Sequence, residues 1–79
     1  MSRTFDAQRH EALRAFLVER RKSAGLRQVD LAKRLGRSQS YVSHIEMGQR
    51  HVALIELIEW AEAIGFDPEE AITEIAKIK

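Results

Sequence analysis

Five side chains that can form hydrogen bonds lie close together within residues 39–44 of this 79-residue chain. Val42 and Ile45 are three residues apart, so on a helix both would point inward and leave the polar side chains outward. The amide of Gln39 can donate and accept hydrogen bonds together, which matches the N6 and N7 edge of adenine. This chemistry favours the reading of nucleic-acid bases over catalysis. The outward residues are Gln39, Ser40, Tyr41, Ser43 and His44.

A sharp turn must position this segment against the one before it. Leu31 and Leu35 are four residues apart and share one face of a first helix. Gly36 can adopt a left-handed conformation that ends this helix, and Ser38 can cap the next one. Ala32 is small enough to let the two helices approach closely. The connector is therefore only about three residues long, the length expected of a helix-turn-helix.

The rest of the chain adds three helices and no strand pattern, so we predict an all-α fold. Asp67 can cap the last helix, and Pro68 suits its first turn because the missing N–H costs nothing there. We expect a single domain over residues 1–79. The five expected helices span about residues 6–24, 28–35, 39–46, 53–64 and 67–78.

The residue types that the chain lacks argue against several kinds of activity. It contains no cysteine, which removes disulfides, thiolate chemistry and Cys-based zinc sites. His10, His44 and His51 show no metal-ligand spacing, and there is no glycine-rich phosphate loop or nucleophile with an adjacent base. We therefore expect that the protein is not an enzyme and that it binds neither a metal ion nor a cofactor.

The net charge of +1 conceals an uneven distribution. Residues 1–51 hold eleven Lys and Arg against five acidic residues, whereas residues 52–79 hold two Lys against seven acidic residues. This division would orient the molecule on a polyanion. No apolar run approaches the roughly 20 residues of a membrane span, and the N-terminus lacks the apolar core of a signal peptide. We expect a soluble, cytoplasmic protein with no membrane partner.

From about Leu17 to about Ile75 the chain resembles the phage-repressor or Cro-type helix-turn-helix proteins, also called the xenobiotic-response-element (XRE) family. The resemblance implies a lambda-repressor-like fold and DNA-binding regulation of transcription. Family members often carry proline shortly after the exit glycine, where this chain has Gln49-Arg50-His51-Val52. The matching residues are Gln28, Leu31-Ala32, Gly36, Val42, Ile45 and Glu46-Met47-Gly48, with Arg21 and Ala24-Gly25-Leu26 upstream and Leu54, Leu57, Ala61 and Ile64-Gly65 downstream.

The resemblance implies that the second helix of the motif enters the major groove of double-stranded DNA. Gln39, Ser40 and His44 then occupy the usual base-reading positions, and His44 can donate to N7 or O6 of guanine. Tyr41 and Ser43 flank them and would contact thymine methyl groups or phosphate.

Other residues would grip phosphate or hold the reading helix in place. Gln28 begins a helix whose free N–H groups favour an anion, and in the family the matching Gln grips the backbone. The resemblance also implies a partly buried ion pair between Arg21 and Glu46. Further expected phosphate contacts are Gly48, Gln49 and Arg50 of the following loop, while Arg27 and Arg37 are either phosphate contacts or ordinary surface arginines.

The helix expected over residues 53–64 is apolar around most of its circumference, so it must be covered on more than one side. We expect that the surplus apolar surface forms a homodimer. The alternative is that the last helix simply folds back and closes the core of the monomer. The expected interface residues are Trp60, Ile72, Ile75 and Ile78.

The function we expect is sequence-specific regulation of transcription, most simply repression from a two-fold symmetric operator. Activation through contact with RNA polymerase is equally possible chemically. As an alternative function, the same fold serves in antitoxins, which bind a partner toxin protein as well as their own operator.

Overall fold

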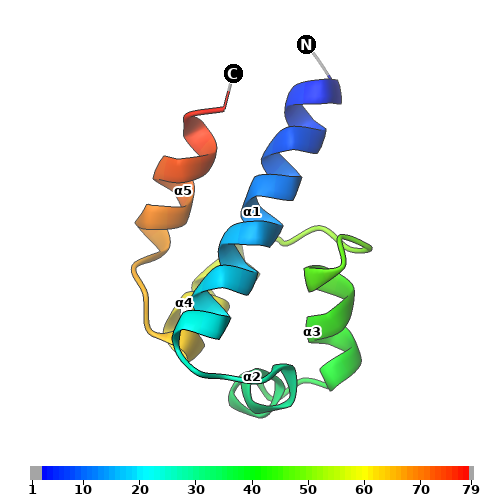
Figure 1. Cartoon of the computed structure of the whole chain (residues 1–79), viewed down its shortest axis with the longest axis vertical. Helices are drawn as coiled ribbons and strands as arrows, with labels where there is room; N and C mark the ends of the chain where they lie inside the picture. The colour runs from blue at the N-terminus through cyan, green and yellow to red at the C-terminus, as the bar shows by residue number, and fades with distance from the viewer. Residues whose placement is uncertain (1–2, 79) are drawn as a thin grey trace.

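Five helices joined by short turns make up residues 3–78, the part of the chain that this computed structural model describes (Figure 1). No strand occurs in this part, so the predicted all-α fold is confirmed. The two motif helices have the bounds expected from the sequence, and the other three differ from the expectation by at most three residues at an end. The helices are α1 (Arg3–Ser23), α2 (Gln28–Leu35), α3 (Gln39–Glu46), α4 (Leu54–Ile64) and α5 (Pro68–Ala76).

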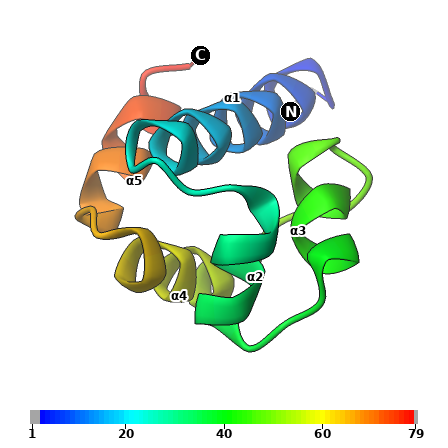
Figure 2. The same ribbon diagram turned by 60° about the horizontal axis from the view of Figure 1, so that its bottom comes forward.

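Helix α1 is the element around which the others are arranged. Figure 1 shows α5 on one side of it, α3 on the other, and α2 beyond its C-terminal end. Figure 2, turned by 60°, shows α4 alongside α2. The core therefore lies where α1, α2, α3 and α4 meet, and its largest fully buried side chains are Trp60, Leu17, Leu31, Ile45 and Val42.

The turn between α2 and α3 has the predicted construction. Gly36 has φ +68°, in the left-handed region, and its N–H donates to carbonyl groups in the last turn of α2. The hydroxyl of Ser38 accepts a hydrogen bond from the backbone N–H of Tyr41 at 3.2 Å, which caps α3. Ala32 is buried where α2 faces α3. A small residue and two short caps thus set the angle at which α3 leaves the turn.

Helix α5 folds back along α1, as the alternative prediction allowed. The carboxylate of Asp67 caps its N-terminus by accepting the N–H of Glu69 at 2.9 Å. Ala71 is fully buried against the core, and the guanidinium of Arg9 donates to the carbonyl of Ile78 at 2.8 and 3.2 Å. The outer side of α5 stays uncovered in the monomer, however, and on it Ile72 is 50% exposed.

Trp60 corrects one sequence-based prediction. We expected it in a subunit interface, but its side chain is fully buried and its indole N–H donates to the hydroxyl of Tyr41 at 3.1 Å. It belongs to the inner side of α4, whereas Leu54 and Ile55 on the same helix are 63% and 64% exposed. Apolar residues at eight of the eleven positions of α4 had hidden which side faced the core.

None of the helices within residues 3–78 combines the length and the apolar character needed to cross a membrane. Over the same residues, no group of three His, Asp or Glu side chains lies together in a way that could hold a metal ion. The sequence has no cysteine to supply a further ligand.

Candidate nucleic-acid interface

The outer side of α3 brings together three of the predicted base-reading residues. Val42 and Ile45 point inward and are buried, which leaves Gln39, Ser40 and His44 exposed on the opposite side. Figure 1 shows α3 along one edge of the molecule with no other helix outside it. This surface can therefore be approached by a large ligand without any rearrangement of the fold.

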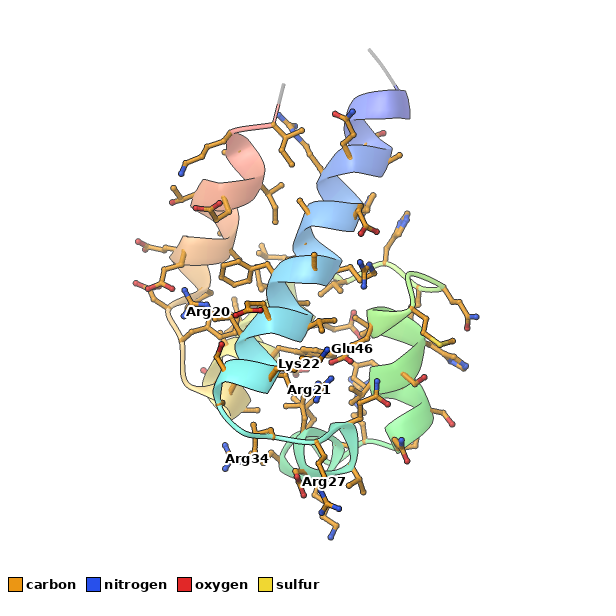
Figure 3. The ribbon with its side chains drawn as sticks, viewed as in Figure 1. Arg20, Arg21, Lys22, Arg27, Arg34 and Glu46 are labelled. Atoms are coloured by element: carbon orange, nitrogen blue, oxygen red, sulfur yellow. The ribbon has the colours of Figure 1, made fainter. Side chains whose placement is uncertain are left out.

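A buried ion pair fixes the end of α3 to α1. The carboxylate of Glu46 accepts hydrogen bonds from Nε of Arg21 at 2.6 Å and from Nη2 at 3.0 Å. The two side chains are only 9% and 5% exposed, and they point toward each other in Figure 3. Arg21 also donates to the carbonyl of Leu26 at 2.6 Å. The predicted ion pair is present, and its guanidinium additionally holds the segment that leads into α2.

The same carboxylate begins a polar chain that ends on the outer side of α3. Nε2 of Gln28 donates to Oε1 of Glu46 at 2.9 Å. Oε1 of Gln28 in turn accepts a hydrogen bond from Nε2 of Gln39 at 3.3 Å. Because one N–H of Gln39 is used in this way, its amide is oriented, and its oxygen and second N–H are the groups left for a ligand. The chain links the buried charge to an exposed side chain through α2.

Tyr41 does not belong to this group of side chains. Its ring is half-buried on the side of α3 that faces α4, and its hydroxyl donates to Glu56 at 3.2 Å while accepting from Trp60. Burial raises the pKa of this hydroxyl. The guanidinium carbons of Arg37 and Arg50 lie 4.4 and 5.2 Å from the ring centroid. Tyr41 is thus a platform for two cations, and its hydroxyl is engaged within the protein.

Glu56 is a buried carboxylate beside the candidate interface that the sequence analysis did not single out. It is only 8% exposed, and it accepts hydrogen bonds from Arg50 at 2.8 Å and from the N–H of Ala53 at 2.9 Å. Its hydrogen bonds to Arg50 are the main reason that its pKa falls to about 2. The signal that could have revealed it is its position three residues after Ala53, the N-cap residue of α4, where the side chain of glutamate commonly accepts the N–H of the N-cap residue.

Two cations are held at the surface by this arrangement. The side chains of Arg37 and Arg50 are 42% and 43% exposed, and each lies within 4.0 Å of the carboxylate of Glu56. Arg37 lies in the turn between α2 and α3, whereas Arg50 belongs to the exit loop, which we define as residues 47–53. In this loop Gly48 has φ +78°, and a Cβ atom there would lie 3.4 Å from Cδ of Arg14. The backbone of the loop therefore packs closely on α1 while its polar groups remain outside.

The remaining predicted phosphate contacts lie near these residues but are held less firmly. Gln49 is exposed in the exit loop. Arg27 donates twice to the carboxylate of Asp30 at 3.0 Å, and its side chain is 76% exposed. Ser43 is half-buried, and its hydroxyl lies 3.7 Å from the sulfur of Met47. Arg34 points away from α3 and donates to the carbonyl of Ala63 (Figure 3).

Comparison with known sequences matches the same part of the chain. A family model described as helix-turn-helix matches residues 17–70. A curated relative from Sinorhizobium fredii, the uncharacterized HTH-type transcriptional regulator y4dJ, is 40% identical over 53 residues, which are 67% of this chain and 69% of the relative. The matched region includes both motif helices and most of the scaffold around them.

Solved structures with the same fold include three bacterial proteins. An XRE-family-like protein from Pseudomonas syringae superposes with a TM-score of 0.89 at 37% identity, covering 96% of this chain and 93% of the other. The restriction-modification controller protein C.AhdI from Aeromonas hydrophila has a TM-score of 0.72 at 35% identity, over 78% and 94% of the two chains. The clp gene regulator ClgR from C. glutamicum has a TM-score of 0.78 at 29% identity, over 87% and 90%.

Replacement of Glu46 by glutamine tests the buried ion pair. We expect Glu46→Gln to lower the free energy of unfolding by about 3 kcal/mol, because the guanidinium of Arg21 would remain buried without a compensating charge. Thermal melts at pH 7 measure the change, and Glu62→Gln on the exposed side of α4 serves as the control. Equal melting midpoints for wild type and Glu46→Gln would contradict this assignment.

The low pKa of Glu56 gives a second prediction with a defined pH window. We expect Glu56→Gln to destabilise the fold by about 2 kcal/mol at pH 7, since Arg50 and the N–H of Ala53 lose a charged acceptor. The carboxyl has a pKa of about 2 in the folded state and an ordinary value of 4.5, so its contribution is complete above pH 4.5 and is lost toward pH 2. Urea unfolding of both proteins between pH 7 and 2.5 should show the difference shrinking. A difference that stays constant over this range would refute the role given to the carboxylate.

Proposed function

This chain belongs to the XRE-type helix-turn-helix family of DNA-binding transcriptional regulators, and we propose that it is a repressor that binds a two-fold symmetric operator as a homodimer. The observation that carries the proposal is the outer side of α3, where Gln39, Ser40 and His44 are exposed on a helix whose inner side is locked to the core. A helix of this kind fits the major groove, which is wide enough to admit it.

Base reading is assigned to the exposed residues of α3. Gln39 lies in the first turn and its amide is oriented through Gln28, which suits bidentate contact with adenine. Ser40 and His44 lie on the same exposed side, and Ser43 at its margin adds a hydroxyl for a nearby base or phosphate. Tyr41 is omitted from this set because its hydroxyl is already bonded within the protein.

Phosphate contacts are assigned to the two ends of this surface. At one end lies the N-terminus of α2, where Gln28 retains an amide N–H and the helix presents unpaired backbone N–H groups. At the other end lie Gly48 and Gln49 of the exit loop together with Arg50. Arg27 directly precedes α2, and Arg37 shares the carboxylate of Glu56 with Arg50. These two exposed cations therefore add positive charge near the two ends of the surface. These contacts would fix the register in which α3 meets the bases.

The dimer is assigned to a surface different from the one expected at first. Trp60 is left out of the proposed interface because it is buried, and exposed apolar side chains of α4 take its place. The isoleucines expected at the C-terminal end of the chain are kept. Leu54, Ile72 and Ile75 also line a shared groove between the two helices. A two-fold axis through this surface would cover the same residues on both copies. The proposed interface residues are Leu54, Ile55, Ile58, Ile72, Ile75 and Ile78.

DNA recognition is tested on duplexes that the protein selects by binding from a pool of random sequences. On the selected duplex we expect Gln39→Ala to weaken binding about 5- to 150-fold and to relax preference at one base pair, which corresponds to about 1–3 kcal/mol. Gln49→Ala should weaken binding equally on all sequences, because phosphate contacts carry no sequence information. The control is Glu62→Ala. Failure to enrich any sequence, or an affinity that is indifferent to salt, would overturn the proposal.

Sedimentation at micromolar protein tests the dimer. We expect wild type to sediment as a dimer and Ile55→Glu to sediment as a folded monomer with the helical content of wild type by circular dichroism, because the side chain is 64% exposed in the monomer. The matched control is Met47→Glu, which replaces another exposed apolar side chain outside the proposed interface. A wild-type monomer that binds its duplex one-to-one would contradict the proposed dimer. The exposed apolar surface would then be assigned to contact with a partner protein, as in an antitoxin.

A further inference from the structure

Two histidine rings stack on each other where α1 meets the exit loop. The rings of His10 and His51 have centroids 3.5 Å apart and planes inclined by only 5°. His10 comes from the first half of α1, and His51 follows the residues assigned to phosphate contact. Both residues are exposed, and both line one open pocket together with Arg14, Gly48 and Arg50. Neither histidine has a role in the packing of the core or in the outer side of α3.

Two arginines and one glutamate, Glu11, line this pocket beside the histidines, and each arginine is paired with a carboxylate. Arg14 bonds the carboxylate of Glu11 at 2.9 and 2.5 Å and the carbonyl of Glu46 at 2.7 Å, so its position is fixed. Arg50 is fixed in the same way by Glu56. The charged and titratable groups near the histidine pair are therefore Asp6, Glu11 and Arg14 of α1, Arg50 of the exit loop and Glu56 of α4.

The stacking geometry brings two imidazole rings into contact at the edge of one pocket. Histidine is the side chain whose charge ordinarily changes between about pH 5 and 8. Two protonated rings 3.5 Å apart would repel each other. The nearby charges of Arg14 and Arg50 are each paired with a carboxylate, Glu11 and Glu56. An oxyanion in the pocket would offset the repulsion and would accept N–H groups from the rings. Anion binding and protonation therefore favour each other in this place.

We propose that the pocket between α1 and the exit loop binds an oxyanion of the DNA backbone phosphate and that the His10–His51 pair takes up a proton when it does so. This inference rests on the proposed function, because it requires the exit loop to lie against DNA. It extends the phosphate-contacting surface beyond the helix-turn-helix to α1. It also makes the affinity for DNA depend on pH through residues that read no bases.

Sulfate tests the pocket without DNA, because it is an oxyanion that does not titrate in this range. The imidazole C–H resonances of His10 and His51 are followed by NMR from pH 8 to 5 in sodium sulfate and in sodium chloride at equal ionic strength. We expect higher titration midpoints in sulfate for both residues, with His44 on α3 as the internal reference. Identical midpoints in the two salts would show that the pocket binds no oxyanion and would overturn the inference.

The selected duplex tests whether the anion is a DNA phosphate. At constant ionic strength, uptake of one proton should strengthen wild-type binding up to about tenfold per pH unit as the pH falls from 8 to 6. We expect His10→Gln and His51→Gln each to reduce the change in duplex affinity with pH. The control His44→Gln should keep the share of this change that comes from the His10–His51 pair. Both substituted positions are exposed, so thermal melts should match wild type.

The two possible failures are distinguishable. If the duplex binds tightly with the same pH dependence in wild type and in His10→Gln, the inference fails while the proposed function stands. If the protein binds no duplex at any pH, the proposed function fails, and the assignment of the anion to DNA fails with it. A shift in sulfate without a pH effect on the duplex would refute the DNA phosphate as the ligand.

Discussion

The carboxylate of Glu46 is the group on which the arrangement of α1, α2 and α3 depends. A charge buried this deeply is stable only while Arg21 compensates it, so α3 cannot move relative to α1 without a large electrostatic cost. The amide of Gln28 donates to the same carboxylate, and its oxygen accepts a hydrogen bond from the amide of Gln39, so both side chains are held in place. One buried charge thus determines both the position of α3 and the direction of a side chain on its outer surface.

A second carboxylate holds the opposite side of α3. Glu56 binds the hydroxyl of Tyr41 near the start of α3 and the guanidinium of Arg50 in the exit loop, so it ties both to α4. The inner and lateral sides of α3 are therefore occupied by internal contacts. What remains free is a strip of short polar side chains bordered by cations, and this is the surface that a major-groove ligand would meet.

The sequence predicted local features well because their causes are local. Gly36 and Ser38 determine the turn through their own backbone and hydroxyl, and the bounds of α2 and α3 follow. The misplaced residues depend on which neighbour covers a helix. Trp60 lies on a helix with few polar positions, so periodicity could not show that it is buried in the core, bonded to Tyr41 of α3, rather than in contact with a second subunit. The role of Glu56 depends on Arg50, which reaches it only once the exit loop has folded.

A double-mutant cycle between Gln28 and Gln39, measured as affinity for a selected duplex, tests the central claim most directly. If Gln28 orients the amide of Gln39, the loss caused by Gln28→Ala should be smaller once Gln39 is already alanine, with a coupling energy above about 0.5 kcal/mol. Strictly additive losses would show that the polar chain does not extend from the buried carboxylate to the reading surface.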